Sequence, residues 1–493
     1  MNVSALLPWQ RWMAGLAALA ALGMLTAGVA ADAMAKDLDH LPAPHADPLS
    51  SLPLKLDLGP ILPGDDARIS CPATFTLPEV LSLGDAVDLA LCNDPQLQAA
   101  WATIRLRAAG LGQARSAYLP SLTLTAGRQM GRQTRSGTQA DIDSSIAGTS
   151  YSASLGWRLF DFGGREAGTR SAQALLDAAM ASHDASMQKV LAGVVQSYFD
   201  AQTAEAAWHA RQRQETMAST MLETVARREQ RGAAARTDRL QAATELARAS
   251  LERNRADGAY RKSLAQLAAA LGIAAADRLK LANDLADPED TLRNELDNWL
   301  ERAQAQHPGL SSARAQLDAA RQNIIATRSE GLPTLELSGA LYRNGRPNQG
   351  PVQDSRESVI GVMLRIPLFD GFAHTYKVRG AQAQADQKEA ELREVERQVM
   401  LDVAQAYADA SAALGNLTTS KALLMAAEQA RDSVQRKYDR NAASIQDLLS
   451  TQRAHDEAGQ ERLRCLADWR SARLRLLAAA GGLGRWALRP AQH

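Results

Sequence analysis

The chain has 493 residues, enough for more than one ordinary domain, and its 55 basic and 55 acidic side chains cancel. This balance gives no electrostatic reason to expect nucleic acid as a partner. Aromatic residues make up only 4% of a sequence dominated by Ala, Leu, Gln and Arg, a mixture that favours long helices packed through small side chains.

Residues 1–35 have the features of a secretory signal peptide. Arg11 supplies a positive charge, an apolar run covers residues 13–27, and Ala33-Met34-Ala35 offers a small-x-small cleavage site. We therefore expect an exported chain; the alternative is an uncleaved membrane anchor, for which the apolar run is somewhat short. Farther along, no uninterrupted apolar stretch is long enough to cross a bilayer as a helix, which leaves a soluble protein or a β-barrel.

The three cysteines fall into two groups. Cys71 and Cys92 are 21 positions apart and flank the start of the first helical pattern. After export they meet oxidising conditions, which favours a disulfide between them. Two independent buried thiols are the alternative. Cys465 lies in a helical pattern next to Leu466, where we expect a packed, unreactive thiol.

The same plan occurs twice along the chain. Asn93-Asp94-Pro95-Gln96-Leu97 corresponds to Gln306-His307-Pro308-Gly309-Leu310, and Leu159-Phe160-Asp161 corresponds to Leu368-Phe369-Asp370. From the second of these landmarks onward the offset stays at 209 residues without a gap. Self-similarity held over such a length predicts a duplicated fold.

Each half is predicted to contain a helix, a hairpin, a very long helix, a turn and another helix. The first helix, expected over Ser82–Ala117, opens with the capping box formed by Ser82 and Asp85. The very long helices are expected over Arg165–Arg231 and Ala373–Arg440, each about 100 Å long at about 1.5 Å per residue. Such helices survive in water only by packing against neighbours, here as coiled coils.

The hairpins, expected within residues 120–160 and 333–369, have alternating side chains. Four segments of about nine residues place apolar side chains on one face, the length of a tilted membrane strand: Ser121–Arg128, Tyr151–Leu159, Thr334–Tyr342 and Ser358–Ile366. Four strands leave open edges in lipid, so several chains must pool their strands into one barrel. A soluble sheet flanked by helices is the alternative. The polar, Gly-rich segments Gln129–Ile146 and Arg343–Glu357 are predicted to be extracellular loops.

Three segments together resemble the TolC family of outer-membrane efflux proteins. They are LSLGDAVDLALCNDP at Leu81–Pro95, LPSL at Leu119–Leu122 and WRLFDFGGR at Trp157–Arg165, and the duplicated plan agrees. The resemblance covers about Leu81 to Leu483. It divides the chain into two repeats, residues 81–272 and 307–483, joined by an equatorial connector at 273–306.

The resemblance implies a mixed α and β membrane protein in the cell outer membrane. Three copies would form a twelve-stranded outer-membrane β-barrel, continued into the periplasm by an α-barrel of coiled-coil helices. Residues 36–80 would be an extended N-terminal arm and residues 484–493 a tail. The implied partners are two further copies of the chain, outer-membrane lipid, a periplasmic adaptor protein, and an inner-membrane ABC exporter or proton-driven pump. Nucleic acid is not an expected partner.

The resemblance also implies roles for residues at the periplasmic turns. Thr237, Asp238 and Tyr438 occupy positions of a gate latch, with a bond from Asp238 to Tyr438 expected, whereas Ala443 replaces the usual gate arginine. Asp447 with Ser450 would line the pore constriction, where a ring of carboxylates favours cations. The alternative for Asp447 is a helix cap, because Asp near a helix N-terminus is stabilising.

No catalytic constellation is expected, so the chain is predicted not to be an enzyme and to need no cofactor or metal. Its eight histidines never show the His-x-x-x-His spacing of a zinc-binding helix. The predicted function is export through a passive channel, most specifically in type I protein secretion. The alternatives are small-molecule, multidrug or metal efflux and, in another class, a coiled-coil structural protein of the envelope that transports nothing.

Overall fold

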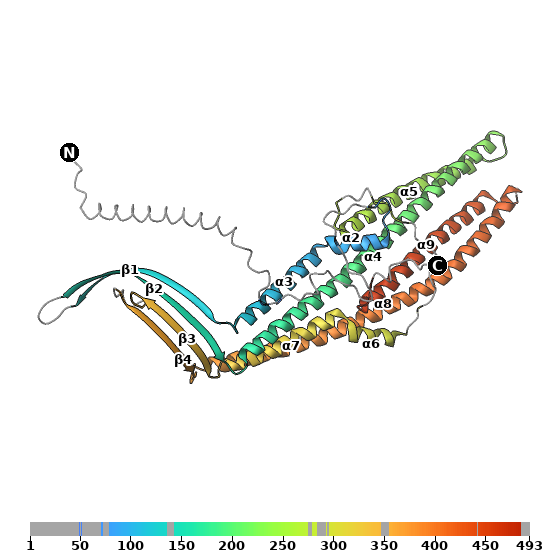
Figure 1. Cartoon of the computed structure of the whole chain (residues 1–493). Coiled ribbons are helices and arrows are strands. Elements are labelled where there is room, and N and C mark those ends of the chain that lie inside the picture. Colours follow the sequence, from blue (N-terminus) through green and yellow to red (C-terminus); the bar gives the residue numbers. More distant parts are fainter. Residues whose placement is uncertain are drawn as a thin grey trace, which may run out of the picture. The chain divides into compact units, whose positions relative to one another are not determined.

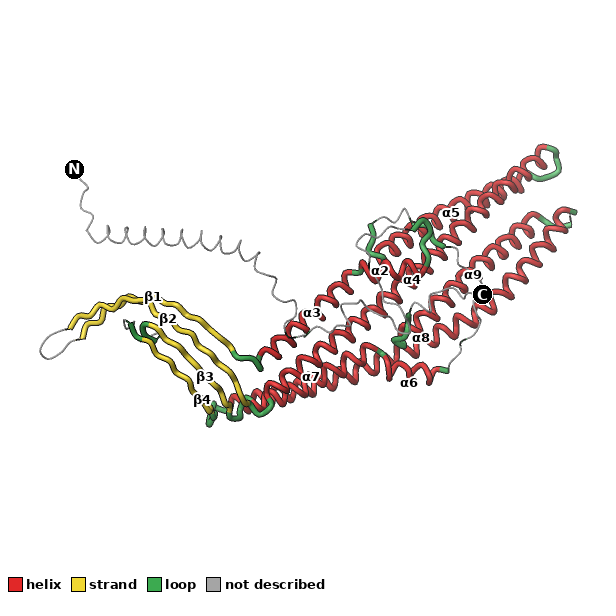
Figure 2. The backbone as a smooth tube through the Cα atoms, viewed as in Figure 1, coloured by secondary structure: helices red, strands yellow, loops and turns green. Residues whose placement is uncertain are grey.

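The structure is a computed structural model. It describes residues 49, 51, 71, 78–135, 142–274, 279–282, 292, 295–346, 354–440 and 442–484. The predicted signal peptide, most of the predicted arm and nearly all of the predicted tail lie outside these residues. Figures 1 and 2 show the arrangement: a four-stranded sheet adjoins one end of a set of long helices, and two helical hairpin turns lie at the other end.

The segment predicted as the first helix is two helices, α2 (Leu83–Asn93) and α3 (Pro95–Ser116). The capping box is confirmed, because the Ser82 hydroxyl accepts a hydrogen bond from the Asp85 amide at 3.1 Å and the Asp85 carboxylate bonds back to Ser82. The prediction of one continuous helix was wrong. Proline disfavours helical geometry in the residue before it, and Asp94 is extended and caps α3 with its carboxylate.

The two very long helices are confirmed within one residue at each end. They are α4 (Gly164–Gln230) and α8 (Ala373–Asp439), each of 67 residues. The residues before them, Gly163 and Phe372, have the positive φ angles 84° and 67°, which turn the chain sharply from strand into helix. Each long helix is followed by a shorter partner of 35 residues, α5 (Arg236–Ala270) or α9 (Ile445–Ala479).

The helices pack as hairpins and across the two halves. α4 contacts α3, α5 and α9, and also α7 (Pro308–Ser329), whereas α8 contacts α9, α7 and the short α6 (Leu296–Gln306). The main core gathers near the middle of the helices, around the fully buried Tyr198 and Trp469. Part of the predicted connector joins it there, since Leu81 pairs with Leu281 in an isolated parallel bridge and its carbonyl accepts from the Tyr198 hydroxyl at 3.1 Å.

The strands form one antiparallel sheet in the order β1-β2-β3-β4, with β1 (Ser121–Arg135), β2 (Ile142–Phe160), β3 (Thr334–Arg343) and β4 (Arg356–Arg365). The four-stranded prediction is confirmed, but most of the first predicted loop is strand. β1 and β2 stay paired as far as Arg135 and Ile142, so their ribbon extends beyond β3 and β4 (Figure 2). The backbone ladder continues there without the apolar alternation that marks a membrane strand.

Candidate functional site

The sheet has one strongly apolar face that no described part of the chain covers. The register places apolar side chains of all four strands on it. Leu122, Leu124 and Ile360 are 75%, 78% and 81% exposed. The other large exposed members are Tyr151, Leu155, Trp157, Leu341, Val362 and Leu364. An apolar surface of this extent marks contact with a membrane or another protein.

The opposite face differs in chemistry. It carries mostly small polar side chains, among them Ser121, Thr123, Ser152, Ser154 and Ser338, with Val359 and Met363 as apolar exceptions. Within the described residues, β1 and β4 each pair with one neighbour only. The sheet therefore presents two open edges and two contrasting faces.

The strand-to-helix turn of the first half, residues 159–165, is held by one arginine and is called the first corner below. Arg165 donates from Nε to the Asp161 carboxylate at 3.0 Å, and from its two terminal nitrogens to the carbonyls of Arg158 and Leu159 at 2.6 and 3.1 Å. Its guanidinium lies 4.9 Å from the ring centre of Tyr118. Both side chains of the ion pair are only 11% exposed. The end of β2, the start of α4 and the end of the α3 segment are thereby fixed together.

The equivalent turn of the second half, residues 368–374, is the second corner, and it lacks this arginine. His374 stands at the position of Arg165, and its backbone amide donates to the Asp370 carboxylate at 2.7 Å. Its ring lies so close to Gly331 that a Cβ at that glycine would be 2.5 Å from Nε2. The nearby ion pair between Lys377 and Glu330 is mostly exposed. Packing against a glycine takes the place of the charged clamp.

Exposed aromatic pairs mark both corners. Phe160 and Phe162 meet edge to face with ring centres 4.8 Å apart, and Phe369 and Phe372 do so at 5.4 Å. All four side chains are about half exposed or more. Aromatic side chains gather in this way where a membrane protein crosses the boundary between lipid and water.

At the other end of the long helices, the α4–α5 and α8–α9 turns pack against each other. Val225, Ala242 and Ile445 form a small buried cluster there, with Tyr438 against it. Arg228 donates to the Tyr438 hydroxyl at 3.2 Å, and its guanidinium lies 5.2 Å from the centre of that ring. Residues 210 positions apart in the sequence are thus joined at this helical tip.

A second polar contact joins the two helical hairpins near the tip, this time between α5 and α9. Arg453 of α9 donates from Nε to the Glu245 carboxylate of α5 at 2.9 Å, and a second, shorter hydrogen bond makes the pair bidentate. The Glu245 side chain is 15% exposed and that of Arg453 is 40% exposed. Bidentate pairs of this kind fix orientation as well as distance.

The exposed apolar sheet, its open edges and the long helical hairpins can be compared with known proteins, and this comparison identifies the family. The family model described as "Outer membrane efflux protein" matches residues 86–273 and 299–482. The chain belongs to this outer-membrane efflux protein family. The match falls on both halves of the duplicated plan, and the predicted family and outer-membrane location are confirmed.

Individual members agree over most of the chain. Protein CyaE of Bordetella pertussis is 37% identical over 416 residues, covering 84% of this chain and 87% of that protein. The alkaline protease secretion protein AprF of Pseudomonas aeruginosa is 28% identical over 425 residues, covering 82% and 85%. Among solved structures, the outer-membrane channel OprN superposes with a TM-score of 0.69 at 19% identity, over 85% of this chain and 98% of that one, which shows the shared fold.

The predicted gate residues lie at the helical tip, but their hydrogen-bond partners differ from the predicted ones. Asp238 accepts from the Ala235 amide at 3.2 Å, whereas Tyr438 is bonded to Arg228. The structure describes both residues, and neither of these hydrogen bonds joins one to the other. Thr237 is exposed and Ala443 is half-buried. The bond expected from Asp238 to Tyr438 is therefore not formed within one copy.

Asp447 is a helix cap. Its backbone amide donates to the Ser444 hydroxyl at 3.1 Å, and its carboxylate accepts from the Ser444 amide at 3.1 Å. The Ser444 hydroxyl also donates to this carboxylate at 2.7 Å. The hydrogen bonds that the Ser444 hydroxyl and amide donate lower the pKa of the exposed Asp447 carboxyl below its ordinary value. Ser450 is also exposed and donates back to the Asp447 carbonyl at 2.9 Å. The capping alternative is confirmed, and a carboxylate so held stays charged at neutral pH.

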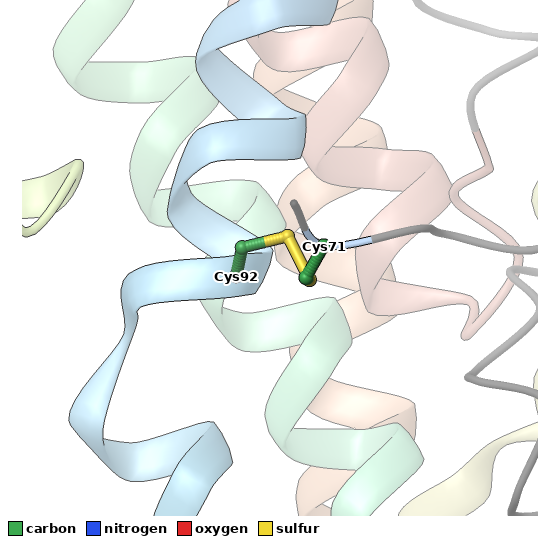
Figure 3. Close-up of a disulfide and its surroundings, with 2 residues drawn as sticks. All are labelled: Cys71 and Cys92. Atoms are coloured by element: carbon green, nitrogen blue, oxygen red, sulfur yellow. A yellow bond between two sulfur atoms is a disulfide. The ribbon is translucent and has the colours of Figure 1, made fainter. Parts of the chain in front are cut away.

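Cys71 and Cys92 are joined by a disulfide with Cα atoms 5.5 Å apart (Figure 3). It ties a residue of the N-terminal segment to the last turn of α2. Cys465 is a buried free thiol, as expected, and burial raises its pKa. Among the described residues, no helix is long and apolar enough to cross a bilayer, and no group of acidic, histidine and cysteine side chains is arranged to hold a metal ion.

Three contacts of the site escaped the sequence reasoning: the Arg165 clamp, the Arg228 bond to Tyr438 and the Glu245 pair with Arg453. The sequence assigns Arg165 only to the start of a long helix and to the end of a family motif, and it predicts no contact for its side chain. The other two join helices that lie about two hundred residues apart, and a single sequence carries no signal for such pairings. The duplication could only have indicated that the two tips lie side by side.

Proposed function

We propose that three copies of the chain form a channel through the outer membrane. The observation that carries this proposal is the open four-stranded sheet with one exposed apolar face. Backbone groups at its two edges would be unpaired in lipid, and only a closed barrel satisfies them. Three copies would supply twelve strands, with the apolar face toward lipid and the small polar face toward the lumen. The long helices would continue the duct into the periplasm.

Conductance across a planar bilayer tests this channel. The purified full-length protein should assemble as a detergent-stable trimer and give discrete, long-lived conductance steps. A structural rod of the envelope gives no such steps. A monomer that stays in solution without detergent, and that leaves bilayers sealed, would contradict the proposal.

We infer that the cargo is protein and that the system is of type I. The support is the similarity over most of the chain to AprF, whose name describes alkaline protease secretion. The partners would be a periplasmic adaptor and an inner-membrane ABC exporter. Deleting the gene in its native host should leave an exported protein inside the cell, with unchanged sensitivity to drugs and metals. The reverse pattern would favour small-molecule efflux and a proton-driven pump.

Copurification tests the partners directly. After mild crosslinking in cells, a tagged chain should recover the adaptor and the exporter together. Since the sheet end lies in the membrane in this proposal, contact should be lost after substitutions at the helical tip and kept after substitutions in β1 to β4. Equal loss from both sets would argue against docking at the tip.

We propose that Asp447, with Ser450 one turn later, lines the constriction of the trimer. Both side chains are exposed in one copy and lie in the first turns of α9. Three Asp447 carboxylates around one axis would favour cations. Asp447→Asn should lower cation preference and weaken block by polyvalent cations, while Asp238→Asn is the matched change in the other half. Unchanged selectivity in the Asp447 variant would remove it from the pore.

The closed state of this channel would rest on the contacts that join the two hairpins of one copy. The Arg228 bond to Tyr438 and the bidentate Glu245 pair with Arg453 hold the tip, and Ala443 contributes no such group. Thr237 and Asp238 are proposed to face a neighbouring copy. Arg453→Gln should raise the open fraction, measured as conductance at fixed voltage. The change should be smaller for Arg248→Gln, since Arg248 lies at 3.6 Å from the same carboxylate and is more exposed.

A further inference from the structure

The apolar face of the sheet ends in a row of basic side chains at the end away from the helices. Arg343 of β3 lies directly opposite Arg356 of β4 in the register, and both follow the apolar side chains of their strands on the same face. Tyr151 of β2 pairs with Arg343 in the same row. Arg128 of β1 lies one step farther out, opposite Thr149. Arg343 and Arg356 therefore mark the outer end of the apolar side chains on β3 and β4, whereas on β1 the exposed Met130 lies beyond Arg128 on the same face.

This placement is unfavourable without a bound anion. Directly opposed residues of antiparallel strands have Cβ atoms about 5 Å apart, and like charges there are destabilising. Arg343 and Arg356 are both exposed. Within the described residues, neither forms an ion pair. The carboxylate of the adjacent Glu357, which the register assigns to the other face, is held by Arg346 at 2.9 Å. No ion pair in the described part of the chain offsets the repulsion between the two guanidinium groups.

The charges at the opposite end of the strands are arranged differently. Arg158 lies near the helix end on the small polar face, and it pairs with Glu336 of β3 at 3.7 Å. There the arginine has an acidic partner and faces away from the apolar side. Arg365 of β4, on the same polar face, forms no ion pair with any residue that the structure describes, so unpaired arginines occur at both ends of the strands and only those of the outer end adjoin the apolar face.

The height of the apolar band fits a bilayer that ends at this row. From Leu335 to Arg343 the strand β3 has eight steps, which is about 27 Å of strand at about 3.4 Å per residue. A tilt of about 40° reduces this to about 21 Å, close to the apolar band of about 25 Å in outer-membrane barrels. Arg343 and Arg356 would lie at the level of the lipid headgroups, with their stems along the apolar surface.

A shallow groove joins the apolar and the basic parts of this face. It has a volume of about 360 Å³ and is lined by Leu124, Tyr151, Leu341, Arg343 and Arg356, with Glu357 and four further residues of β2 to β4. Its apolar end suits an acyl chain. Its basic end offers two guanidinium groups, which bind phosphate oxygens in a planar, bidentate way.

We propose that Arg343 and Arg356, assisted by Arg128, bind the phosphate of a phosphorylated glycolipid in the outer leaflet, with an acyl chain in the adjoining groove. The proposal rests on the proposed membrane orientation of the channel. The occupant is a lipid and not free phosphate, because the arginines continue an apolar surface that is itself built for acyl chains. Each copy of the chain would carry one such site at the outer rim.

Binding to bisphosphorylated lipid A in detergent, measured by thermophoresis on the full-length protein, tests the proposal. Arg343→Gln combined with Arg356→Gln should weaken binding at least tenfold. Removing the phosphates from the lipid should have a similar effect on the wild type and little further effect on the variant. Millimolar inorganic phosphate should not compete. The matched control is Arg158→Gln combined with Arg365→Gln, at the other end of the same strands, which should bind as the wild type does.

Arg343→Lys with Arg356→Lys keeps the charge but loses the planar, bidentate geometry, so it should retain part of the binding that the Gln variant loses. This intermediate binding separates loss of the site from loss of folding. Conductance is recorded for every variant. Equal binding of wild type and Gln variant, or equal binding of phosphorylated and dephosphorylated lipid, overturns the proposal. If channels still form in that case, only the lipid site has failed. If the wild type gives no channels, the proposed function has failed with it.

Discussion

The two halves of the chain share one plan, but their stabilising contacts lie at different positions along the long helices. At the junction of α2 and α3 and at the corner, the first half has the stronger stabilising contacts. Cys92 forms a disulfide, Asp94 caps α3 with two hydrogen bonds, and Arg165 clamps the first corner. The corresponding residues of the second half are Ala305, His307 and His374. The second half thus has no disulfide or charged clamp at these three positions.

At the helical tip the order reverses. The first residue of the α9 capping box is Ser444, which accepts a hydrogen bond from the Asp447 amide. Its counterpart Ala235 has no side-chain oxygen, so only the return bond from its amide to Asp238 is present. Duplication preserved the helix lengths and the sheet, whereas the residues that fix each level diverged between the copies. The comparison predicts that equivalent substitutions in the two halves have unequal effects.

The largest difference is expected at the corners. Arg165→Ala removes the guanidinium from the buried Asp161 carboxylate, which keeps only the hydrogen bond from the backbone amide of residue 165, and it removes the hydrogen bonds to two strand carbonyls. Breaking a buried pair in this way costs about 3 kcal/mol. His374→Ala removes a packed ring that forms no clamp, and we expect a cost of about 1 kcal/mol or less. Urea unfolding of the detergent-solubilised protein measures both free energies.

Hydrogen exchange locates the effect. Exchange at the end of β2 and the start of α4 should accelerate in Arg165→Ala, with the second corner unchanged. Arg165→Lys should recover only part of the loss, because an ammonium group cannot reach all the acceptors that the guanidinium fork holds. Equal losses of stability from the two alanine variants would break the comparison.

The disulfide gives the next largest effect. Replacing Cys71 and Cys92 together by Ser opens a loop of 21 residues, which lowers the free energy of unfolding by about 3 kcal/mol on the chain-entropy model and by less where the native state is strained. Reducing agent should destabilise the wild type to the level of the variant and leave the variant unchanged. Cys465→Ser is the control for the remaining thiol. A wild type indifferent to reductant would remove this brace from the first half.

A pH-dependent difference is expected between the equivalent helix caps of the two halves, Asp94 at the start of α3 and His307 at the start of α7. His307 accepts from the Gly309 amide at 3.1 Å through Nδ1, which requires that nitrogen to carry no proton. Burial lowers the pKa of His307 below its usual value, although Asp402 opposes the shift. A histidine with a lowered folded pKa is fully stabilising above its unfolded pKa of about 6.5, and the contribution declines as the pH falls from there to the folded pKa.

His307→Asn tests this sign. Asparagine caps helices well and does not titrate near neutrality, so the variant should lose the decline in stability below about pH 6.5. Thermal unfolding followed from pH 7.5 to 5 compares the two proteins. Hydrogen exchange at the start of α7 should rise with acid in the wild type only. An unchanged pH profile in the variant would assign the decline to other groups.

The sequence predicted the long helices and the four strands because each signal is local and occurs twice. Helix formers without proline bounded α4 and α8 to within one residue, and alternation of apolar side chains located the apolar part of all four strands. The predicted boundaries were wrong where the regular sequence pattern of a strand or helix was interrupted. The sequence of β1 and β2 beyond the apolar band no longer alternates regularly between apolar and polar residues, and Pro95 outweighed the helical periodicity on either side of it.

The contacts of the site were less predictable than the fold. Capping by Asp447 follows from three neighbouring residues and was foreseen. Arg228 and Tyr438, or Glu245 and Arg453, meet only after the two hairpins pack, and nothing in either local sequence favours these partners over other charged residues of the same helices. The latch bond expected between Asp238 and Tyr438 came from the family resemblance, and the side-chain distances within one copy favoured other partners.

The smallest predicted difference lies at the tip, where the second half has the better cap. Ser444→Ala should destabilise the start of α9 by about 1 kcal/mol, the usual cost of losing a serine N-cap. Ala235→Ser should stabilise the start of α5 by several tenths of a kcal/mol up to about 1, because Asp238 already supplies the other half of a capping box. Hydrogen exchange of the first turns of α5 and α9 resolves changes of this size. In the double variant the start of α5 should become more stable than the start of α9, while the relative stability of the two corners stays the same. The tip and the corners lie about 100 Å apart along α4, and distant substitutions act independently. If the corners responded as well, the braces would act as one coupled system and the division by level would be wrong.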